Sequence, residues 1–192
     1  MIDGVVEDGR KRALGHGCRR VDSVGEATVR RASATDAEAI AGIQLEVWRH
    51  AFSGFLPEQV LDTPVATAAA PWTELISGGV QVLLAAENDM VVGFVHACPA
   101  TAEIASLLVR PAWSRRGHGG RLFAAATAQL AATGTGSGTW WIPEPDTASQ
   151  RFAASVGWTA TTGTRVLDTG VAPLRERCWT GDLEQQLGPL GF

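Results

Sequence analysis

The sequence predicts an α/β protein in which helices flank one mixed central sheet, with elements in the order β-α-α-β-β-β-α-β-α-β-β. Two observations predict this class. Three strand-like segments follow one another with turns of only three residues between them, and later strands alternate with helical segments that begin or end at glycines. A chain of 192 residues is long enough for one domain with a sizeable core. We expect residues 28–192 to form that single domain.

The composition narrows the classes of function. Apolar residues make up 45% of the chain and charged residues 19%, and the net charge of -4 argues against nucleic acid as a partner. The three cysteines lie far apart without metal-ligand spacing, so we expect no metal site and a reduced, cytoplasmic location. No apolar run reaches the roughly 18 residues of a membrane span, and no signal peptide is evident. We therefore expect no membrane partner.

Residues 1–27 are predicted to form a flexible extension. This segment holds glycines and mixed charge without a sustained hydrophobic period. Its basic clusters, residues 10–12 and 19–20, are balanced by nearby acidic residues. A solvated tail is the simpler interpretation, and contact with an acidic partner is the alternative.

The first ordered element is expected to be a short strand at residues 27–32. Thr35 and Glu38 have the spacing of a capping box, which predicts a helix that begins there. One side of this helix is mostly apolar at helical period, so Trp48 is expected to pack in a core. Residues 52–61 then form a loop with apolar side chains that is able to cover a pocket.

A second helical region follows this loop. It is rich in alanine, is expected to be interrupted or restarted at Pro71, and ends at residues 78–79, which are both glycine. The three consecutive strand candidates come next and are expected to form an antiparallel meander. They cover residues 80–86, 90–98 and 102–109.

The final third of the chain alternates strands and helices. A helix of about four turns ends at the glycine-rich run 134–138, and a strand follows at residues 139–142. In that strand Trp140 and Trp141 point to opposite faces, so one is expected in the core and the other beside a pocket. The last elements predicted are a helix at residues 147–155 and strands at 158–168 and 174–182.

The stretch from Leu107 to Leu130 has the pattern strand, glycine-rich loop, helix. Glycines ahead of a helix let backbone N–H groups turn outward, and the helix N-terminus adds partial positive charge. Such a loop is able to hold a phosphate group. A tight turn without a ligand is the alternative interpretation of the same pattern.

This order of elements, with two motifs, resembles the GNAT superfamily of acyl-CoA-dependent N-acyltransferases over about residues 28–183. Residues 109–119, Val-Arg-Pro-Ala-Trp-Ser-Arg-Arg-Gly-His-Gly, look like the acyl-CoA signature of that family. Residues 146–158, which contain Phe152 and end in Gly157-Trp158, are similar to the helix that follows the fifth strand of the family. The two motifs occur in the expected order and spacing.

The resemblance implies a binding site for acetyl-CoA as co-substrate, with no metal. Backbone N–H groups of the loop hold the pyrophosphate, and the edge of the fourth strand pairs with the pantetheine arm. The N–H of Leu107 then donates to the oxyanion that forms at the thioester carbonyl. The residues implied in coenzyme A binding are Leu107, Leu108, Val109, Ser114, Arg115, Arg116, Gly117, His118, Gly119, Gly120, Asp146 and Phe152.

Two positions depart from the family pattern. Ser114 stands where the family usually has Arg or Gln, and Ala153 stands where the family often has a tyrosine that protonates the leaving thiolate. The whole chain has no tyrosine. The acid is therefore missing, or it is supplied by Ser149, Ser155, Cys98 or water.

Direct attack on a thioester needs a neutral amine, so a general base is expected near the substrate. Glu103 is one candidate, because its distance from the glycine loop matches the glutamate that some family members use. His96 is the other, since its ordinary pKa lies near 6.5. The alternatives are a solvated strand residue for Glu103 and a buried sheet histidine for His96.

The sequence thus predicts an N-acetyltransferase that moves an acetyl group from acetyl-CoA to a primary amine by direct attack in a ternary complex. The alternative is an acyl-CoA-binding or regulatory module with little turnover. A small-molecule or peptide amine is expected as the acceptor, contacted by residues 48–61 and the last strands. Homodimers are common in the family, so a homodimer is one expected assembly.

Overall fold

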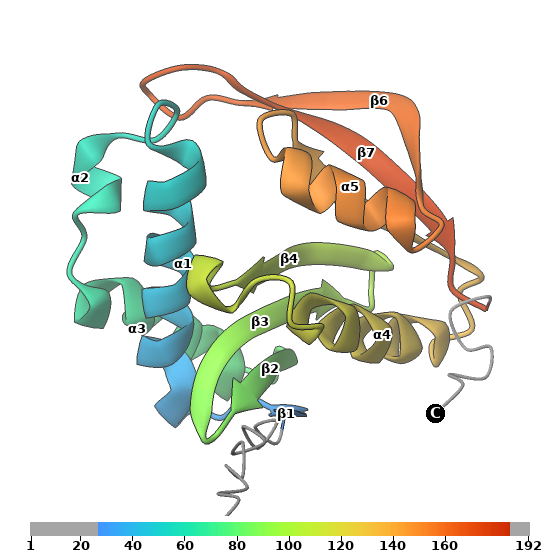
Figure 1. Cartoon of the computed structure of the whole chain (residues 1–192), viewed down its shortest axis with the longest axis horizontal. Coiled ribbons are helices and arrows are strands. Elements are labelled where there is room, and N and C mark those ends of the chain that lie inside the picture. The colour runs from blue at the N-terminus through green and yellow to red at the C-terminus, as the bar shows by residue number, and fades with distance from the viewer. Residues whose placement is uncertain (1–26, 185–192) are drawn as a thin grey trace, which may run out of the picture.

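The computed structural model of the chain describes residues 27–184 and arranges them around one seven-stranded sheet in the order β1-β2-β3-β4-β5-β7-β6 (Figure 1). Neighbouring strands are antiparallel except β4 and β5, which are parallel. The predicted class and order of elements are therefore confirmed, with one short helix more, Glu58–Leu61, inside the predicted loop 52–61. The strands are β1 (Ala27–Arg31), β2 (Val82–Glu87), β3 (Met90–Cys98), β4 (Glu103–Val109), β5 (Ser137–Pro143), β6 (Thr159–Leu167) and β7 (Leu174–Asp182).

Helices cover both faces of the sheet, and each face has its own hydrophobic core (Figure 1). One core contains residues of α1 and α3, and the other contains residues of α4 and α5. Strand β2 serves both, because Val82 and Leu84 pack in the first core while Leu83 and Ala85 pack in the second. The helices are α1 (Ala37–Phe52), α2 (Glu58–Leu61), α3 (Val65–Ser77), α4 (His118–Ala131) and α5 (Thr147–Ser155), with short 3₁₀ turns at Ala34–Asp36 and Pro111–Trp113.

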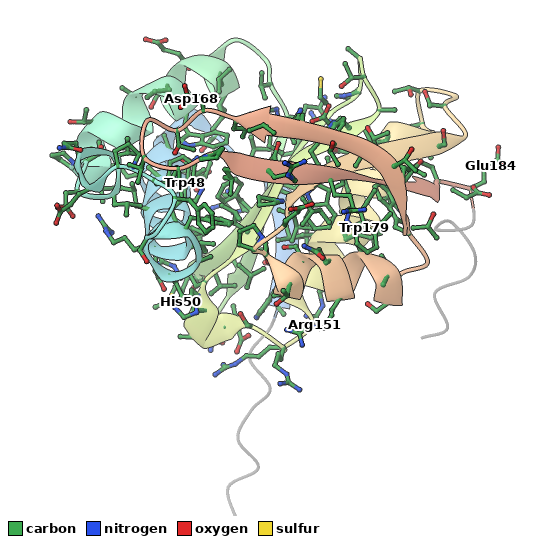
Figure 2. The ribbon with its side chains drawn as sticks, turned by 90° about the horizontal axis from the view of Figure 1, so that it is seen from above. Trp48, His50, Arg151, Asp168, Trp179 and Glu184 are labelled. Carbon is green, nitrogen blue, oxygen red and sulfur yellow. The ribbon has the colours of Figure 1, made fainter. Side chains whose placement is uncertain are left out.

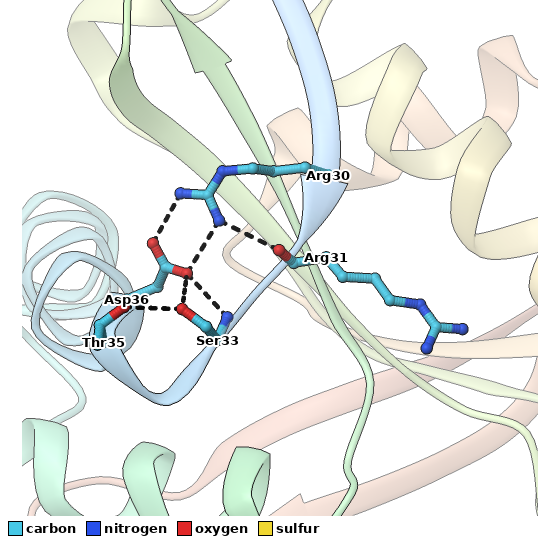
Figure 3. A network of polar contacts seen from close by, with 5 residues as sticks. All are labelled: Arg30, Arg31, Ser33, Thr35 and Asp36. Carbon is cyan, nitrogen blue, oxygen red and sulfur yellow. Dashed lines mark hydrogen bonds and ion pairs between the residues drawn. The ribbon is translucent and has the colours of Figure 1, made fainter.

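The start of the first helical segment differs from the expectation. The capping box is formed by Ser33 and Asp36, two residues earlier than the predicted pair Thr35 and Glu38. The Asp36 carboxylate accepts from the Ser33 N–H, the Ser33 hydroxyl and both terminal nitrogens of Arg30 (Figure 3). These donors, the Arg30 guanidinium first among them, hold the pKa of Asp36 well below its usual range.

Helix α3 runs without interruption through Pro71, so the predicted break at this residue is wrong. The proline ring lies on the exposed side of the helix, and only one backbone hydrogen bond is lost there. The next residue, Trp72, lies on the buried side of α3, and its indole N–H donates to Gln44 Oε1 of α1 at 2.9 Å. Packing against α1 therefore outweighs the local cost of the proline.

The contact between β4 and β5 is short. Only Glu103 with Thr139 and Ile104 with Trp140 form pairs, at the beginning of β4. Beyond Ile104 the two strands separate, and the edge of β4 that faces β5 is left without a strand partner. This separation sets the position of the candidate site.

The predicted extension, residues 1–27, lies outside the described residues apart from Ala27. Among residues 27–184, no helix combines the length and the apolar character that crossing a membrane requires.

Candidate active site

Two cavities meet where β4 and β5 separate. The larger, about 700 Å³, lies beside the glycine loop and the start of α5, and we name it the loop cavity. The smaller, about 440 Å³, lies between α1, α3 and the strands β5 and β7, and we name it the aromatic cavity. The residues that line both cavities are Leu107, Leu108, Trp140, Asp146 and Ser149.

The loop cavity is built at the N-terminus of α4. Arg115 has φ of 64° and Gly117, the residue that caps α4, has φ of 84°, so the backbone of this loop turns through the left-handed region twice. Alternation of this kind makes a concave surface of N–H groups that suits an anion. Gly119 and Gly120 in the first turn of α4 also line the cavity, and the absence of side chains there lets a ligand approach the backbone.

The free edge of β4 forms one wall of both cavities. The N–H of Arg110 donates to Val92 on β3. Because backbone groups alternate along a strand, the N–H groups of Leu107 and Val109 point the other way, to the edge that β5 leaves open. These are the groups that the sequence predicted to meet a pantetheine arm and an oxyanion.

Most residues predicted to bind coenzyme A line the loop cavity. They are Leu107, Leu108, Val109, Ser114, Arg115, Gly117, Gly119, Gly120, Asp146 and Phe152. Asp146 also caps α5, since its Oδ1 accepts from the Ser149 N–H at 2.9 Å. The loop cavity therefore brings together all but two of the residues that the sequence predicted to bind coenzyme A.

The exceptions are His118 and Arg116, whose side chains turn to the sheet. His118 is 1% exposed, and its Nε2 lies 2.8 Å from Glu87 Oε2 at the end of β2. Arg116 lies 3.7 Å from the other oxygen of Glu87 and stacks over Trp113. Neither side chain lines the loop cavity. Of Arg115 and Arg116, only Arg115 lines the loop cavity.

The aromatic cavity corrects the prediction for Trp48. This side chain is half-buried and lines the cavity together with Phe52 of α1 and Trp72 of α3. The connection between β6 and β7 closes the far side, because the Thr169 hydroxyl donates to the carbonyl of Phe55. Asp168 in this connection and Trp48 lie on the same side of the molecule (Figure 2).

The two tryptophans of β5 point to opposite faces, as predicted. Trp140 is 4% exposed and packs against Phe123 and Phe152. Trp141 lines the aromatic cavity, and the guanidinium of Arg165 stacks over its ring at 4.6 Å.

A buried carboxylate that the sequence analysis missed lines the aromatic cavity. Glu176 of β7 is 6% exposed and accepts a hydrogen bond at Oε2 from Arg165 of β6. Its strand position places it opposite Pro143 of β5 and Arg165. The charge pattern Arg-Glu-Arg around Glu176 was visible in the sequence, but its place in a cavity depends on β7 pairing with β5, which no local signal gives.

Neither candidate base lines the loop cavity or the aromatic cavity. Glu103 begins β4, where that strand still pairs with β5, and is not among the residues that line the cavities. His96 of β3 lies opposite Ser106 of β4 and edge to face with Trp72, with ring centroids 6.0 Å apart, and burial lowers the pKa of His96. Glu103 thus lies one residue before Ile104, where the pairing of β4 and β5 ends, but it lines neither cavity.

The candidate acids differ in whether they line one of the two cavities. Ser149 lines both cavities, whereas Ser155 donates to the carbonyl of Phe152 on the exposed side of α5. Cys98 lies opposite Glu103 at the far end of β3. Ala153, at the position of the family tyrosine, is buried in the core. Among residues 27–184, no group of three His, Cys, Asp or Glu side chains is arranged to hold a metal ion.

A mixed sheet that opens between two parallel strands, beside a glycine loop at a helix N-terminus and next to a second cavity, is the arrangement that the resemblance to acyl-CoA-dependent transferases implies. Residues 45–158 match the family model described as the acetyltransferase (GNAT) family. The chain belongs to the GNAT acetyltransferase family. Comparison with curated protein sequences gives no significant match.

Solved structures share this fold. A GCN5-related N-acetyltransferase from Rhodopseudomonas palustris has 19% identity and a TM-score of 0.67, covering 83% of this chain and 97% of its own. The PaiA N-acetyltransferase of Thermoplasma acidophilum, in complex with coenzyme A, has 14% identity and a TM-score of 0.65, covering 82% and 99%. YncA of Salmonella typhimurium, with acetyl-CoA, has 19% identity and a TM-score of 0.63, covering 86% and 99%.

Proposed function

We propose that this protein is an N-acetyltransferase that moves an acetyl group from acetyl-CoA to a primary amine by direct attack in a ternary complex. The observation that carries the proposal is that the two cavities share one wall at the free edge of β4. One cavity has the cradle for a pyrophosphate, and the other is open to an acceptor from the opposite side. Two substrates therefore meet at Leu107 without a covalent intermediate on the protein.

The residues of the loop cavity fit the phosphate end of coenzyme A. The N–H groups at the start of α4 bind the pyrophosphate, and Arg115 adds a positive charge beside them. The Leu107 N–H on the free edge of β4 donates to the thioester oxygen, where negative charge develops during attack. Ser114 lines the cavity with a hydroxyl in place of the longer side chain usual in the family.

Proton transfer uses groups that line the cavities. A carboxylate of the aromatic cavity, Asp146 or Glu176, takes one proton from the acceptor ammonium. The nitrogen lone pair then attacks the carbonyl carbon, so that a C–N bond forms and the C–S bond breaks. The thiolate takes a proton from the Ser149 hydroxyl, which the second proton of the nitrogen restores through water. The net products are an amide, a free thiol and one proton.

The proposal is tested by calorimetry with acetyl-CoA, followed by a thiol-release assay over a panel of primary amines. Binding and amine-dependent thiol release support the transferase. Binding without release from any amine supports instead the acyl-CoA-binding module, which the buried Ala153 and the lack of tyrosine favour. Absence of binding contradicts both functions.

The role of Ser149 is tested by substitution. Ser149→Ala is expected to lower kcat by about tenfold or more with little change in the Kd of acetyl-CoA. Ser155→Ala is the matched control, because this hydroxyl lies on the same helix and is turned away from both cavities.

A further inference from the structure

The walls of the aromatic cavity are large apolar side chains from separate elements. Trp48 and Phe52 come from α1, Trp72 from α3, Trp141 from β5 and Leu174 from β7. The volume of about 440 Å³ is in the range of cavities that hold small organic ligands. Such walls favour a ligand with an apolar body, because its surface is removed from water on binding.

The charged groups of the cavity have one sign. Asp146 and Glu176 line it, and no Lys, Arg or His among residues 27–184 does so. Arg165 contacts Glu176 from outside the cavity and balances one of the two negative charges. The aromatic cavity therefore keeps the equivalent of one negative charge, which one ligand cation neutralises.

Glu176 has an oxygen available for a ligand. Within the described part of the chain, Arg165 is the one residue that hydrogen-bonds to this carboxylate, and it uses Oε2. Oε1 is left to accept from a bound ammonium group, which has three N–H donors. Since the Glu176 side chain is only 8% exposed, a hydrogen bond formed there is shielded from water and strengthened.

We propose that the acceptor is a primary monoamine with an aromatic or branched apolar group, and that Glu176, with Asp146 at the junction of the cavities, binds its ammonium. This inference rests on the proposed function and specifies its substrate. The apolar group packs among Trp48, Phe52 and Trp72. A carboxylate on the ligand adds to the negative charge of a cavity that no Lys, Arg or His among residues 27–184 lines, and a second ammonium exceeds the one negative charge that Arg165 leaves unbalanced there.

The first test compares amines that differ in one group. With acetyl-CoA at saturation, thiol release is measured for 2-phenylethylamine, for phenylalanine, which adds a carboxylate, and for butylamine and 1,4-diaminobutane, which differ by one ammonium. We expect kcat/KM for 2-phenylethylamine to exceed that for phenylalanine and for the diamine at least about tenfold. Butylamine is expected to exceed the diamine.

The outcomes separate this inference from the proposed function. Turnover that is equal for the four amines, or fastest for phenylalanine or the diamine, overturns the inference and leaves the transferase in place. Thiol release from none of them, and from no polar amine or peptide of the wider panel, overturns both.

The second test uses variants. With 2-phenylethylamine as the acceptor, Glu176→Gln is expected to raise KM about ten- to a hundredfold and to leave the Kd of acetyl-CoA unchanged. Glu144→Gln is the matched control, because Glu144 also pairs with strand arginines, Arg175 and Arg177, but lines neither cavity. Equal KM values in the two variants overturn the role of Glu176.

A third variant keeps the inference testable if Glu176→Gln fails to fold, which thermal unfolding detects. Trp48→Ala removes an aromatic wall and leaves the carboxylates in place. It is expected to lower kcat/KM for 2-phenylethylamine more than for butylamine, because butylamine has less surface to bury there. An equal loss for both amines contradicts the apolar half of the inference.

Discussion

His118 Nε2 lies 2.8 Å from Glu87 Oε2, which joins the first residue of α4 to the last residue of β2. Arg116 approaches the other oxygen of the same carboxylate. Glu87 thus anchors the end of the glycine loop and the first residue of α4 to the sheet.

His118→Ala is expected to lower the free energy of unfolding by about 2–4 kcal/mol, because it leaves a hole in the core and removes a hydrogen bond to a carboxylate. The Kd of coenzyme A is expected to rise as well, since the loop loses its anchor. Urea unfolding and calorimetry measure the two effects. His50→Ala, an exposed histidine of α1, is the stability control, and an equal loss in both variants contradicts the role of His118.

Replacing each of two glycines of the loop by alanine is expected to change the stability of the protein by different amounts. Gly120 has open space where a Cβ would lie, so Gly120→Ala is expected to leave stability unchanged or raise it by about 0.5–1 kcal/mol. Gly117 has φ of 84°, and Gly117→Ala is expected to cost about 1 kcal/mol or more. Coenzyme A affinity is expected to fall in both, because both glycines line the loop cavity.

Urea unfolding and calorimetry on the two variants separate backbone strain from crowding of the ligand. A Gly120→Ala protein that is as unstable as Gly117→Ala, or that binds coenzyme A as tightly as the unaltered chain, contradicts this distinction.

Asp36→Asn is expected to cost about 1 kcal/mol at pH 7, because the amide cannot replace the ion pair with Arg30, which is half-exposed. The pKa of Asp36 is lowered in the folded chain, so its contribution is full above the ordinary pKa near 4 and declines as the pH falls below that value. Urea unfolding at pH 7, 5 and 3 is expected to show the difference between variant and unaltered chain shrinking at pH 3. Asp62→Asn, at an exposed aspartate, is the control.

His96 is expected to make the protein less stable at mildly acid pH. Burial lowers its pKa in the folded chain, so below about pH 6.5 the unfolded chain binds a proton that the folded chain resists. His96→Asn is therefore expected to lose less stability than the unaltered chain between pH 7 and pH 5. Urea unfolding at the two pH values measures this, and an unchanged pH dependence contradicts it.

Glu103→Gln is expected to change kcat by no more than about twofold, because Glu103 lines neither cavity. The measurement is thiol release from pH 6 to pH 9 with an amine that the enzyme accepts. A large loss that is greatest at low pH would restore Glu103 as the base that its spacing suggested.

Much of the fold could be predicted from the spacing of apolar residues along the sequence. The meander of β2, β3 and β4 and the glycine loop were predictable because their signals are local: alternating or continuous apolar runs, short turns, and glycines before a helix. The capping box was placed wrongly because Ser33 and Asp36 gain a further partner from β1, the guanidinium of Arg30. A pattern confined to one turn contains no information about that strand.

The acceptor side of the site was less predictable for the same reason. Glu176 lies beside the cavity only because β7 inserts between β5 and β6, a pairing between strands distant in the sequence. The sequence placed His118 in the glycine loop motif, but its partner Glu87 lies on β2, which is distant in the sequence. Trp48 looked like a core residue because an apolar face at helical period is the same whether it meets a core or a cavity wall.

The short pairing of β4 with β5 also divides the chain in its own order. Residues 27–132 build β1 to β4 with α1 to α4, and residues 137–184 build β5 to β7 with α5. The sheet joins these halves through Glu103 and Ile104, and packing of Phe123 against Trp140 and Phe152 supports the seam. A ligand that accepts hydrogen bonds from the free edge of β4 and contacts α5 touches both halves. Because such a ligand binds only when the halves are together, its binding is expected to raise the free energy of unfolding.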